Sequence, residues 1–335
     1  MNIPALRFFA FPRRPSAVRD SACLWFFLLL LLSLAACGQN GTVGQGSLSP
    51  HAFARAVSRH SAISAPVPPD RYQSVVQFNL AYGPLPGERL DLCTPWHAPG
   101  VHPGVLLIHG GGWQSGDKSF FLAMCKKLAT QGFVAATINY RLAPRFTWPA
   151  QLVDAQLAVR WLRAHAQQAG LDPRRLCAWG QSAGGHLAVF LGTLATIHPG
   201  DEAHLLADQS PAVSCVVDAF GPIDLTAPLG VTARPLVLHL FGGVTLRENR
   251  ALYRDASPIF AVSSHSAPTL ILQGTRDTLV LPGQSRELQA ALQDHHVLVD
   301  YRSYNGSHSY AGLSPQRVSA LQAQVIAFLI ARERA

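Results

Sequence analysis

The sequence predicts an α/β fold in which helices cover both faces of a mostly parallel central sheet. Three observations carry this prediction. Short, continuous apolar runs alternate along the chain with stretches whose apolar residues recur at helical spacing. Runs such as Val105–Ile108 are apolar without alternation, as expected of strands that are buried on both faces. The composition, 48% hydrophobic and 14% charged, supplies enough apolar material for one sizeable core.

The strands follow from two kinds of run. Tyr72–Leu80 and Arg89–Cys93 alternate apolar with polar residues across a Gly/Pro turn, which predicts an antiparallel hairpin with one exposed face. Continuous apolar runs predict the remaining strands, at Gly104–Ile108, Phe133–Asn139, Arg175–Trp179, Ser214–Phe220, Thr269–Gln273 and Val297–Tyr301.

Amphipathic stretches between these runs predict the helices, at Gln151–Gln168, Ala183–Leu194, Gln284–Leu292 and Pro315–Arg334. One connection is longer than the others and is rich in Gly and Pro, with a short helical pattern at Arg234–Phe241. We expect this insertion, about residues 222–266, to form a small cap. Parallel sheets bind ligands at the carboxyl ends of their strands, so the residues that follow each run are the candidates for function.

The first 36 residues predict a signal peptide. Four arginines precede the apolar run Ala22–Ala36, which is shorter than the ~20 residues of a membrane span. The run ends in Leu34-Ala35-Ala36-Cys37, which resembles a bacterial lipobox. That resemblance implies cleavage before Cys37, lipidation of its thiol and a lipid anchor in the bacterial cell envelope, on the outer-membrane or periplasmic side. An uncleaved signal anchor is the alternative. Residues 37–70 then read as a flexible tether, and residues 71–335 as the folded domain.

Charge and cysteine content exclude two classes of site. Loss of residues 1–36 lowers the formal net charge from +8 to +5, and the remaining Lys and Arg are scattered, so nucleic-acid binding has no support. The cysteines left in the domain, Cys93, Cys125, Cys177 and Cys215, lack metal-binding spacing, so no metal is expected. Cys177 and Cys215 lie in apolar runs, which predicts buried, inert thiols. Whether any cysteines pair is left open.

A possible nucleophile follows one of the strands. Gly180-Gln181-Ser182-Ala183-Gly184 is a G-x-S-x-G motif between a predicted strand and a predicted helix. A nucleophilic serine needs this tight turn to expose its hydroxyl, and the glycines allow the backbone to crowd there. The start of the helix also points N–H groups at developing negative charge.

A serine nucleophile needs a base and an acid that orients the base. Asp277 and His308 both follow predicted strands and therefore lie on the same rim as Ser182. Asp224 and Asp300 are alternative acids. We expect Ser182, Asp277 and His308 to form the catalytic group.

Two further histidines are assigned structural roles. His186 shares a helix face with Ser182 and would approach it from within that helix, so we expect it to be packed in the core. We expect His109 to tie its own loop together.

The stretch HGGGWQSGDKS, His109–Ser119, has two interpretations. It is nearly a phosphate-binding loop, but Asp117 separates Gly from Lys and would add negative charge beside phosphates. An oxyanion hole needs only backbone N–H groups facing the serine. We therefore expect Lys118 to be an ordinary residue at the start of a helix. The expected oxyanion donors are Gly111, Gly112 and Ala183.

Together these residues resemble the α/β-hydrolase superfamily, most closely its feruloyl-esterase-like and acetyl-esterase branch near the hormone-sensitive lipases. The motifs, in chain order, are HGGGWQSGDK, YRLAP, WPAQLVDAQLAVRWLRAHA, GQSAGGHLA, FGPIDL, ASPI, GTRDTLV and GSH. The resemblance implies a nucleophile at Ser182, an orienting acid at Asp277 and a base at His308. It also implies that Trp113 and the YRLAP segment, Tyr140–Pro144, help shape the site. Trp113 and Phe220 are the expected residues of the substrate pocket. Whether Trp113 also lends its N–H group is left open.

The expected function is hydrolysis of short-chain or aryl carboxylic esters, including carbohydrate-linked acetyl or feruloyl esters, through an acyl-enzyme and without a cofactor. The expected partners are a small-molecule ester and a membrane. Arylformamide hydrolysis on the same scaffold is one alternative, since HGGGW loops also occur in relatives with that activity. A non-catalytic, ligand-binding protein is another, and a broken catalytic group would mark it.

Overall fold

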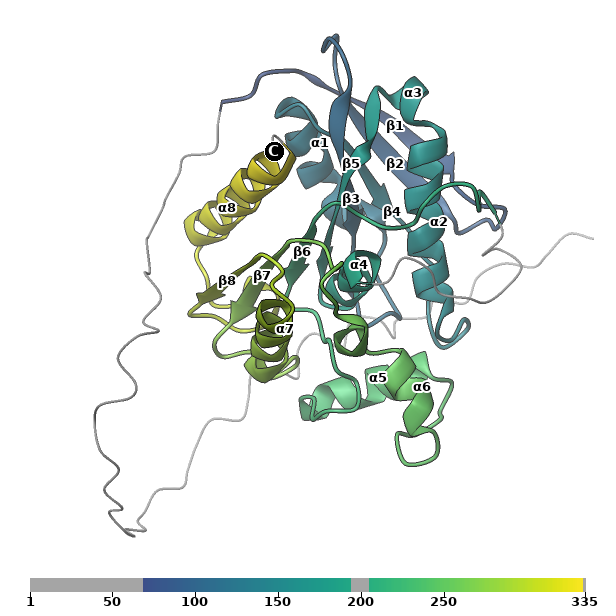
Figure 1. The fold of residues 1–335 in the computed structure, drawn as a ribbon, viewed down its shortest axis with the longest axis vertical. Coiled ribbons are helices and arrows are strands. Elements are labelled where there is room, and N and C mark those ends of the chain that lie inside the picture. The colour runs from purple at the N-terminus through teal and green to yellow at the C-terminus, as the bar shows by residue number, and fades with distance from the viewer. Residues whose placement is uncertain (1–68, 194–204, 334–335) are drawn as a thin grey trace, which may run out of the picture. The chain divides into compact units, whose positions relative to one another are not determined.

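An eight-stranded sheet with the order β1-β2-β4-β3-β5-β6-β7-β8 organises the protein (Figure 1). It comes from a computed structural model that describes residues 69–193 and 205–333, all within one compact unit. The pairs β1–β2 and β2–β4 are antiparallel, and the other strand pairs of the sheet are parallel. These pairings confirm the expected hairpin followed by a parallel sheet. The strands are β1 Ser74–Ala81, β2 Arg89–Pro95, β3 His102–Ile108, β4 Val134–Ile138, β5 Leu171–Gln181, β6 Val216–Ala219, β7 Thr269–Gly274 and β8 Val299–Tyr304.

Helices cover both faces of this sheet, as the apolar runs predict. The helices α1 and α8 pack on one face, and α2, α4 and α7 pack on the other. Four short 3₁₀ helices are also described: η1 Lys118–Phe121, η3 Val231–Ala233, η4 Pro258–Ala261 and η5 His308–Tyr310. The α-helices are α1 Leu122–Thr130, α2 Ala150–Ala164, α3 Ala166–Ala169, α4 Ala183–Thr193, α5 Arg234–Leu240, α6 Arg250–Asp255, α7 Pro282–Asp294 and α8 Pro315–Glu333.

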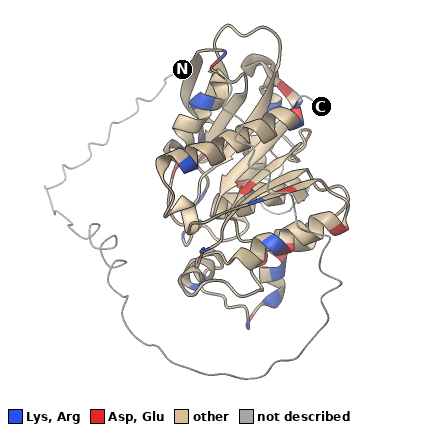
Figure 2. Ribbon diagram, turned by 90° about the vertical axis from the view of Figure 1, so that its left-hand side faces the viewer, with Lys and Arg blue, Asp and Glu red and all other residues tan. Residues whose placement is uncertain are grey.

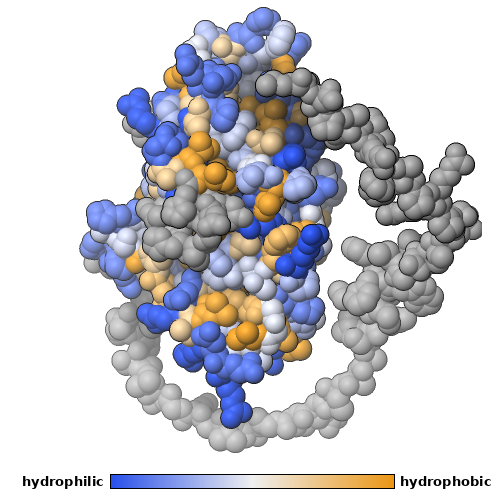
Figure 3. All heavy atoms as spheres, turned by 90° about the vertical axis from the view of Figure 1, so that its right-hand side faces the viewer, coloured by the Kyte–Doolittle hydropathy of each residue, from blue (hydrophilic) through white to orange (hydrophobic). Residues whose placement is uncertain are grey.

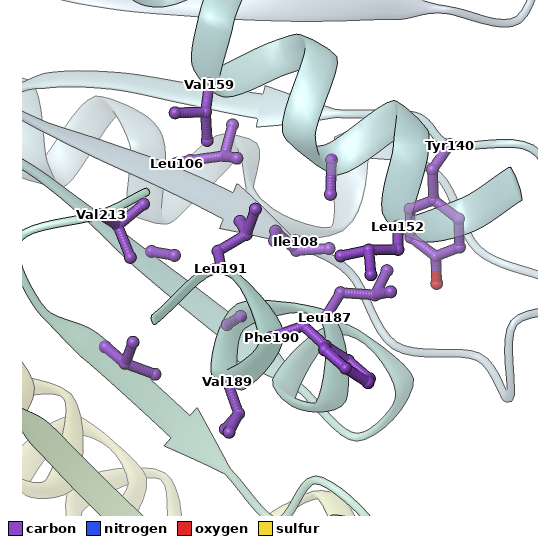
Figure 4. Close-up of a cluster of buried hydrophobic side chains, with 14 of the residues drawn as sticks. Leu106, Ile108, Tyr140, Leu152, Val159, Leu187, Val189, Phe190, Leu191 and Val213 are labelled. Atoms are coloured by element: carbon purple, nitrogen blue, oxygen red, sulfur yellow. The ribbon is translucent and has the colours of Figure 1, made fainter. Parts of the chain in front are cut away.

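Alternation along β3 shows how a continuous apolar run serves both layers. Val105 and Leu107 belong to the cluster under α1 and α8, whereas Leu106 and Ile108 belong to the cluster under α2 and α4. All four side chains are fully buried. Figure 4 shows Leu106 and Ile108 among side chains from α2 and α4. Both faces of this strand pack against apolar side chains, which is why its sequence lacks alternation.

The last strand lies later in the chain than expected. The apolar run predicts Val297–Tyr301, but β8 pairs with β7 from Val299 to Tyr304. Because β8 is an edge strand with a single neighbour, polar residues such as Arg302 can continue it without being buried. The expected helix Gln151–Gln168 is likewise divided, into α2 and α3.

The long connection between β6 and β7 contains η3, α5, α6 and η4. Figure 1 shows α5 and α6 projecting beyond the strands. We refer to residues 222–266 as the cap. The expected signal peptide, Cys37 and the tether up to residue 68 lie outside the described residues. Within the described ranges, no helix is both long and apolar enough to cross a membrane.

Two disulfides correct one expectation. Cys177 and Cys215 are joined to each other rather than being inert thiols, and Cys93 is joined to Cys125. Ala178 of β5 pairs with Val216 of β6, which places the two preceding cysteines side by side with their Cα atoms 4.5 Å apart. The pairing depends on which strands are neighbours, and the spacing along the chain does not reveal that.

Candidate active site

Ser182 occupies the sharp turn between β5 and α4. Its backbone φ is +54°, a left-handed value that costs a non-glycine residue energy. A hydrogen bond to the neighbouring strand holds the turn, since the Ser182 N–H donates to the Ala219 carbonyl at the end of β6 at 2.9 Å. The flanking glycines are required sterically. A Cβ on Gly180 would lie 1.9 Å from the Gly184 carbonyl oxygen, and one on Gly184 would lie 2.1 Å from the Ile108 carbonyl oxygen.

The structure brings Ser182, His308 and Asp277 together in one hydrogen-bonded chain. The His308 Nε2 lies 2.9 Å from the Ser182 Oγ, and its Nδ1 lies 2.7 Å from the Asp277 Oδ2. Asp277 follows β7 and His308 begins η5 after β8, so all three lie at the carboxyl ends of strands. This arrangement leaves the serine hydroxyl beside a ring nitrogen that can accept its proton.

Backbone and amide donors hold the Asp277 carboxylate in this position. Its Oδ1 accepts from the N–H groups of Leu279 and Val280 at 2.9 and 3.0 Å. Its Oδ2 accepts from the Gln273 Nε2 at 3.3 Å as well as facing His308. Asp277 is 3% exposed, and these donors fix the orientation of its carboxyl group. With Asp277 as the partner of Nδ1, the Nε2 of His308 faces Ser182 and can act as a base.

The two alternative acids have other partners. Asp224 accepts from the Thr226 N–H and hydroxyl, both at 2.7 Å, and so forms a turn at the base of the cap. Asp300 pairs with Arg302 within β8. Asp277 is therefore the acid that faces His308.

The loop after β3 passes directly against the serine turn. A Cβ on Gly110 would lie 2.9 Å from the Gln181 carbonyl oxygen and 3.2 Å from the Ser182 Cβ. The Gly111 carbonyl accepts from Gln114 and Ser115, so the loop curls back on itself. Among the described residues, the N–H groups of Gly111 and Gly112 have no hydrogen-bond acceptor. With the Ala183 N–H at the start of α4, they are available to an oxyanion.

Trp113 lines the pocket beside Ser182, and its indole N–H group already donates a hydrogen bond within the protein. The Trp113 Nε1 donates to the His186 Nδ1 at 3.3 Å. His186 is fully buried, and its Nε2 donates to the Ala256 carbonyl at 2.8 Å. Burial lowers the pKa of His186 to about 4, so the ring is neutral and can hold both hydrogen bonds. This agrees with the structural role expected for His186.

A small apolar pocket adjoins Ser182, with a volume of about 20 Å³. Gly112, Trp113 and Ala183 form its inner side. Apolar cap residues form much of the rest, including Leu229, Ala233, Leu236 and Val237. No sequence pattern marks these cap residues, because an apolar side chain that lines a pocket looks like one that fills a core.

Phe220, which was expected to line the pocket, packs against the catalytic histidine. Phe220 is completely buried at the end of β6 and is absent from the residues around the pocket. Its ring stands edge-to-face with the His308 ring at 4.8 Å and with the Tyr310 ring at 5.1 Å. Phe220 thus belongs to the buried cluster under α1 and α8 and supports the His308 ring.

The remaining parts of the glycine loop are structural. The His109 ring stacks on Tyr140 at 4.3 Å, and the Tyr140 hydroxyl donates to the His109 carbonyl at 3.0 Å. Lys118 lies at the start of η1, as expected, and its ammonium group also pairs with the buried Asp91 at 2.8 Å. That lysine is therefore committed to a protein carboxylate rather than to a phosphate. The phosphate-loop interpretation has no support in this geometry.

Charged residues are sparse and scattered over the described residues (Figure 2). Within these residues, one group of three potential metal ligands lies close together: Cys177, Cys215 and Glu333. Two of the three are joined in a disulfide, so the group does not offer a metal its ligands.

Comparison with known proteins finds esterases among the relatives of this chain. The model of the BD-FAE family matches residues 90–292. Esterase LipQ of Mycobacterium tuberculosis is 30% identical over 270 residues, which cover 77% of this chain and 62% of LipQ. The probable carboxylic ester hydrolase LipM of the same organism is 32% identical over 203 residues, 57% of this chain and 46% of LipM. The matched part thus spans less than two thirds of the length of these relatives.

Solved structures share the fold. A truncated carbohydrate esterase from gut microbiota superimposes with a TM-score of 0.68 and 25% identity, covering 80% of this chain and 99% of that one. The thermophilic esterase Est2 of Thermogutta terrifontis superimposes with a TM-score of 0.64 and 23% identity, covering 78% and 96%. The second likeness shows the fold alone.

Proposed function

Because the chain belongs to the BD-FAE family, we propose that it is a serine carboxylic ester hydrolase that works through an acyl-enzyme. The single observation that carries the proposal is the hydrogen-bonded chain from Ser182 through His308 to Asp277, which faces a small apolar pocket. The esterase names of its relatives support the same reaction.

The reaction follows from these positions. The Ser182 oxygen attacks the ester carbonyl carbon while its proton passes to His308 Nε2. The N–H groups of Gly111, Gly112 and Ala183 stabilise the negative charge on the carbonyl oxygen. Collapse of this intermediate breaks the ester bond, and the leaving alkoxide takes the proton from His308. Water then attacks the acyl group, gives its proton to His308, and the carboxylic acid leaves as the Ser182 hydroxyl is restored.

The size of the pocket favours a short acyl group. Its volume of about 20 Å³ is little more than the ~10–15 Å³ that one water molecule needs. An acetyl methyl group fits such a space, and we propose acetyl esters as the preferred substrates. One structural relative is a carbohydrate esterase, which supports a carbohydrate-linked acetyl ester as the natural form.

The test is substitution of the nucleophile. Ser182→Ala should lower kcat for p-nitrophenyl acetate by a factor of about 10³ or more, because the acyl-enzyme cannot form. Ser119→Ala, at an exposed serine of the same chain, is the matched control and should keep wild-type turnover. A fluorophosphonate probe should label the wild type at Ser182. Assays with N-formylkynurenine beside the aryl ester separate ester from formamide hydrolysis. Near-normal ester turnover by a folded Ser182→Ala protein would refute the proposal.

We also propose that residues 1–36 are removed, that Cys37 is lipidated, and that residues 37–70 tether the catalytic domain, residues 71–335, to the bacterial envelope. Both disulfides support export, because such bonds persist in oxidising compartments. A palmitate analogue fed to cells should label the wild type in the membrane fraction. A Cys37→Ala protein that remains equally labelled and membrane-bound would contradict this.

A further inference from the structure

The cap contains a second apolar cavity. Its volume is about 350 Å³, and its walls include Leu225, Leu229, Val237, Leu246 and Tyr253, with Arg234 as its charged residue. Cavities of this size hold small organic ligands. Figure 3 views the molecule from the right-hand side of Figure 1. Hydrophobic side chains gather on the lower part of this face, at the height where Figure 1 places α5 and α6.

Leu229 and Val237 line this cavity and also line the small pocket beside Ser182. They are the two residues common to both linings. They are 9% and 4% exposed, so their side chains are packed between the two spaces. These two side chains therefore form a partition, with about 20 Å³ on the side of the serine and about 350 Å³ on the other.

The partition is fixed relative to the catalytic group. Gly230, next to Leu229, donates its N–H to the Leu279 carbonyl at 3.2 Å. A Cβ on Gly230 would lie 1.8 Å from the Thr278 carbonyl oxygen, so the two backbones are in close contact. Leu279 also donates its N–H to Asp277. The segment that carries Leu229 thus rests on the loop that holds the catalytic carboxylate.

We propose that Leu229 and Val237 set the acyl-chain length, and that the cap cavity is the space a longer straight-chain acyl group enters when either side chain is shortened. This inference rests on the proposed ester hydrolysis and names the determinant of its substrate class. The pocket beside Ser182 has room for about one methyl group before it reaches the partition. The residues that line the cavity beyond the partition are predominantly apolar. Each methylene that gains burial there should improve kcat/KM roughly fourfold.

The experiment measures kcat/KM for p-nitrophenyl acetate, butyrate, hexanoate and octanoate with the full-length protein. The wild type should fall at least about tenfold from acetate to hexanoate. Val237→Ala and Leu229→Ala should each raise the hexanoate-to-acetate ratio about fifteenfold, the effect of burying two methylenes. Leu238→Ala is the matched control, because Leu238 lies on the same helix and is absent from both linings. Its ratio should equal that of the wild type.

A second variant tests the destination of the chain. In the Val237→Ala background, Leu246→Trp places a larger side chain at a residue that lines only the cap cavity, and should return the ratio toward the wild-type value. An unchanged ratio in folded Val237→Ala and Leu229→Ala, or a raised ratio that Leu246→Trp leaves untouched, would overturn the inference. If the wild type hydrolysed none of these esters, the proposed function would be overturned instead. Failure of the inference and failure of the proposed function are therefore distinguishable.

Discussion

The indole N–H of Trp113 donates to the Nδ1 of His186 and links the glycine loop to helix α4. On the other side of the imidazole ring, the His186 Nε2 donates to the carbonyl of Ala256, the residue that follows α6 in the cap. One neutral side chain thus joins the oxyanion loop, the helix behind Ser182 and the cap. Trp148 and Phe190 pack around the same ring, so water does not replace either hydrogen bond.

Replacement of His186 should affect both stability and kcat. His186→Phe leaves the Trp113 N–H and the Ala256 carbonyl without partners, at a cost of about 1–3 kcal/mol each in the free energy of unfolding. Because Trp113 adjoins the oxyanion donors, kcat should fall about tenfold, less than the ~10²–10³ lost with a whole donor, while KM changes little. Trp113→Phe removes the same hydrogen bond, so the double variant should lose less than the sum. Strict additivity in urea unfolding and in kcat would contradict the link.

Asp218 predicts a distinct dependence of stability on pH. It is fully buried in β6, and its Oδ1 accepts from the Gly221 N–H at 2.8 Å. Desolvation raises its pKa to about 7 from an ordinary value of 3.8. The folded protein therefore holds this proton where the unfolded chain has lost it. The stability that the protonated group contributes is complete below about pH 4 and is lost as the pH rises to about 7, a change on the order of 4 kcal/mol.

The control for this effect is Asp218→Asn, which keeps the shape of the protonated acid and cannot ionise. Between pH 5 and pH 8, the free energy of unfolding of the wild type should fall relative to that of the variant. Asp154, whose pKa is raised to about 6, and His186, whose pKa is lowered, are present in both proteins and cancel in the difference. Parallel stability curves from urea titrations at these pH values would show that Asp218 does not carry the proton.

The ion pair of Lys118 and Asp91 predicts an asymmetric response to substitution. The side chains are 14% and 2% exposed, and the Lys118 N–H also donates to Asn139. The pair therefore fastens the end of the glycine loop to β2. Lys118→Met leaves a buried carboxylate without its cation and should cost about 3–5 kcal/mol of unfolding free energy. Asp91→Asn combined with Lys118→Met should recover most of that loss in urea unfolding. A double variant no more stable than Lys118→Met alone would argue against the pair.

The fold and the catalytic group could be predicted from the sequence for a shared reason. Parallel strands buried on both faces give continuous apolar runs such as Val105–Ile108, and their carboxyl ends all meet at one rim. Ser182 and Asp277 follow two such strands, and His308 follows the edge strand β8, whose carboxyl end lies on the same rim. The edge strand β8 lacks this signature, and its position was accordingly misplaced.

Other features depend on neighbours that the chain order does not specify. The Cys177–Cys215 disulfide requires β5 and β6 to lie side by side. Lys118 pairs with Asp91 of β2, a strand that comes earlier in the chain and is not its neighbour in sequence. Phe220 and Val237 are both buried and apolar, yet one supports His308 and the other walls a pocket. The hydrophobic pattern of the sequence distinguishes buried residues from exposed ones, but it does not distinguish residues that fill a core from residues that line a cavity.

The disulfides give a final prediction that depends on the length of the loops they close. Cys93–Cys125 spans 32 residues and Cys177–Cys215 spans 38, and both restrict the unfolded chain. The chain-entropy relation assigns each about 4 kcal/mol at 25 °C, and measured values are commonly 2–4 kcal/mol. Cys93→Ala/Cys125→Ala and Cys177→Ala/Cys215→Ala should each lower the midpoint of urea unfolding, by similar amounts because the loops are similar. Non-reducing peptide mapping of protein isolated from an oxidising compartment should recover both linked pairs. Alkylation of these cysteines in the unfolded protein without prior reduction would show that the bonds do not form.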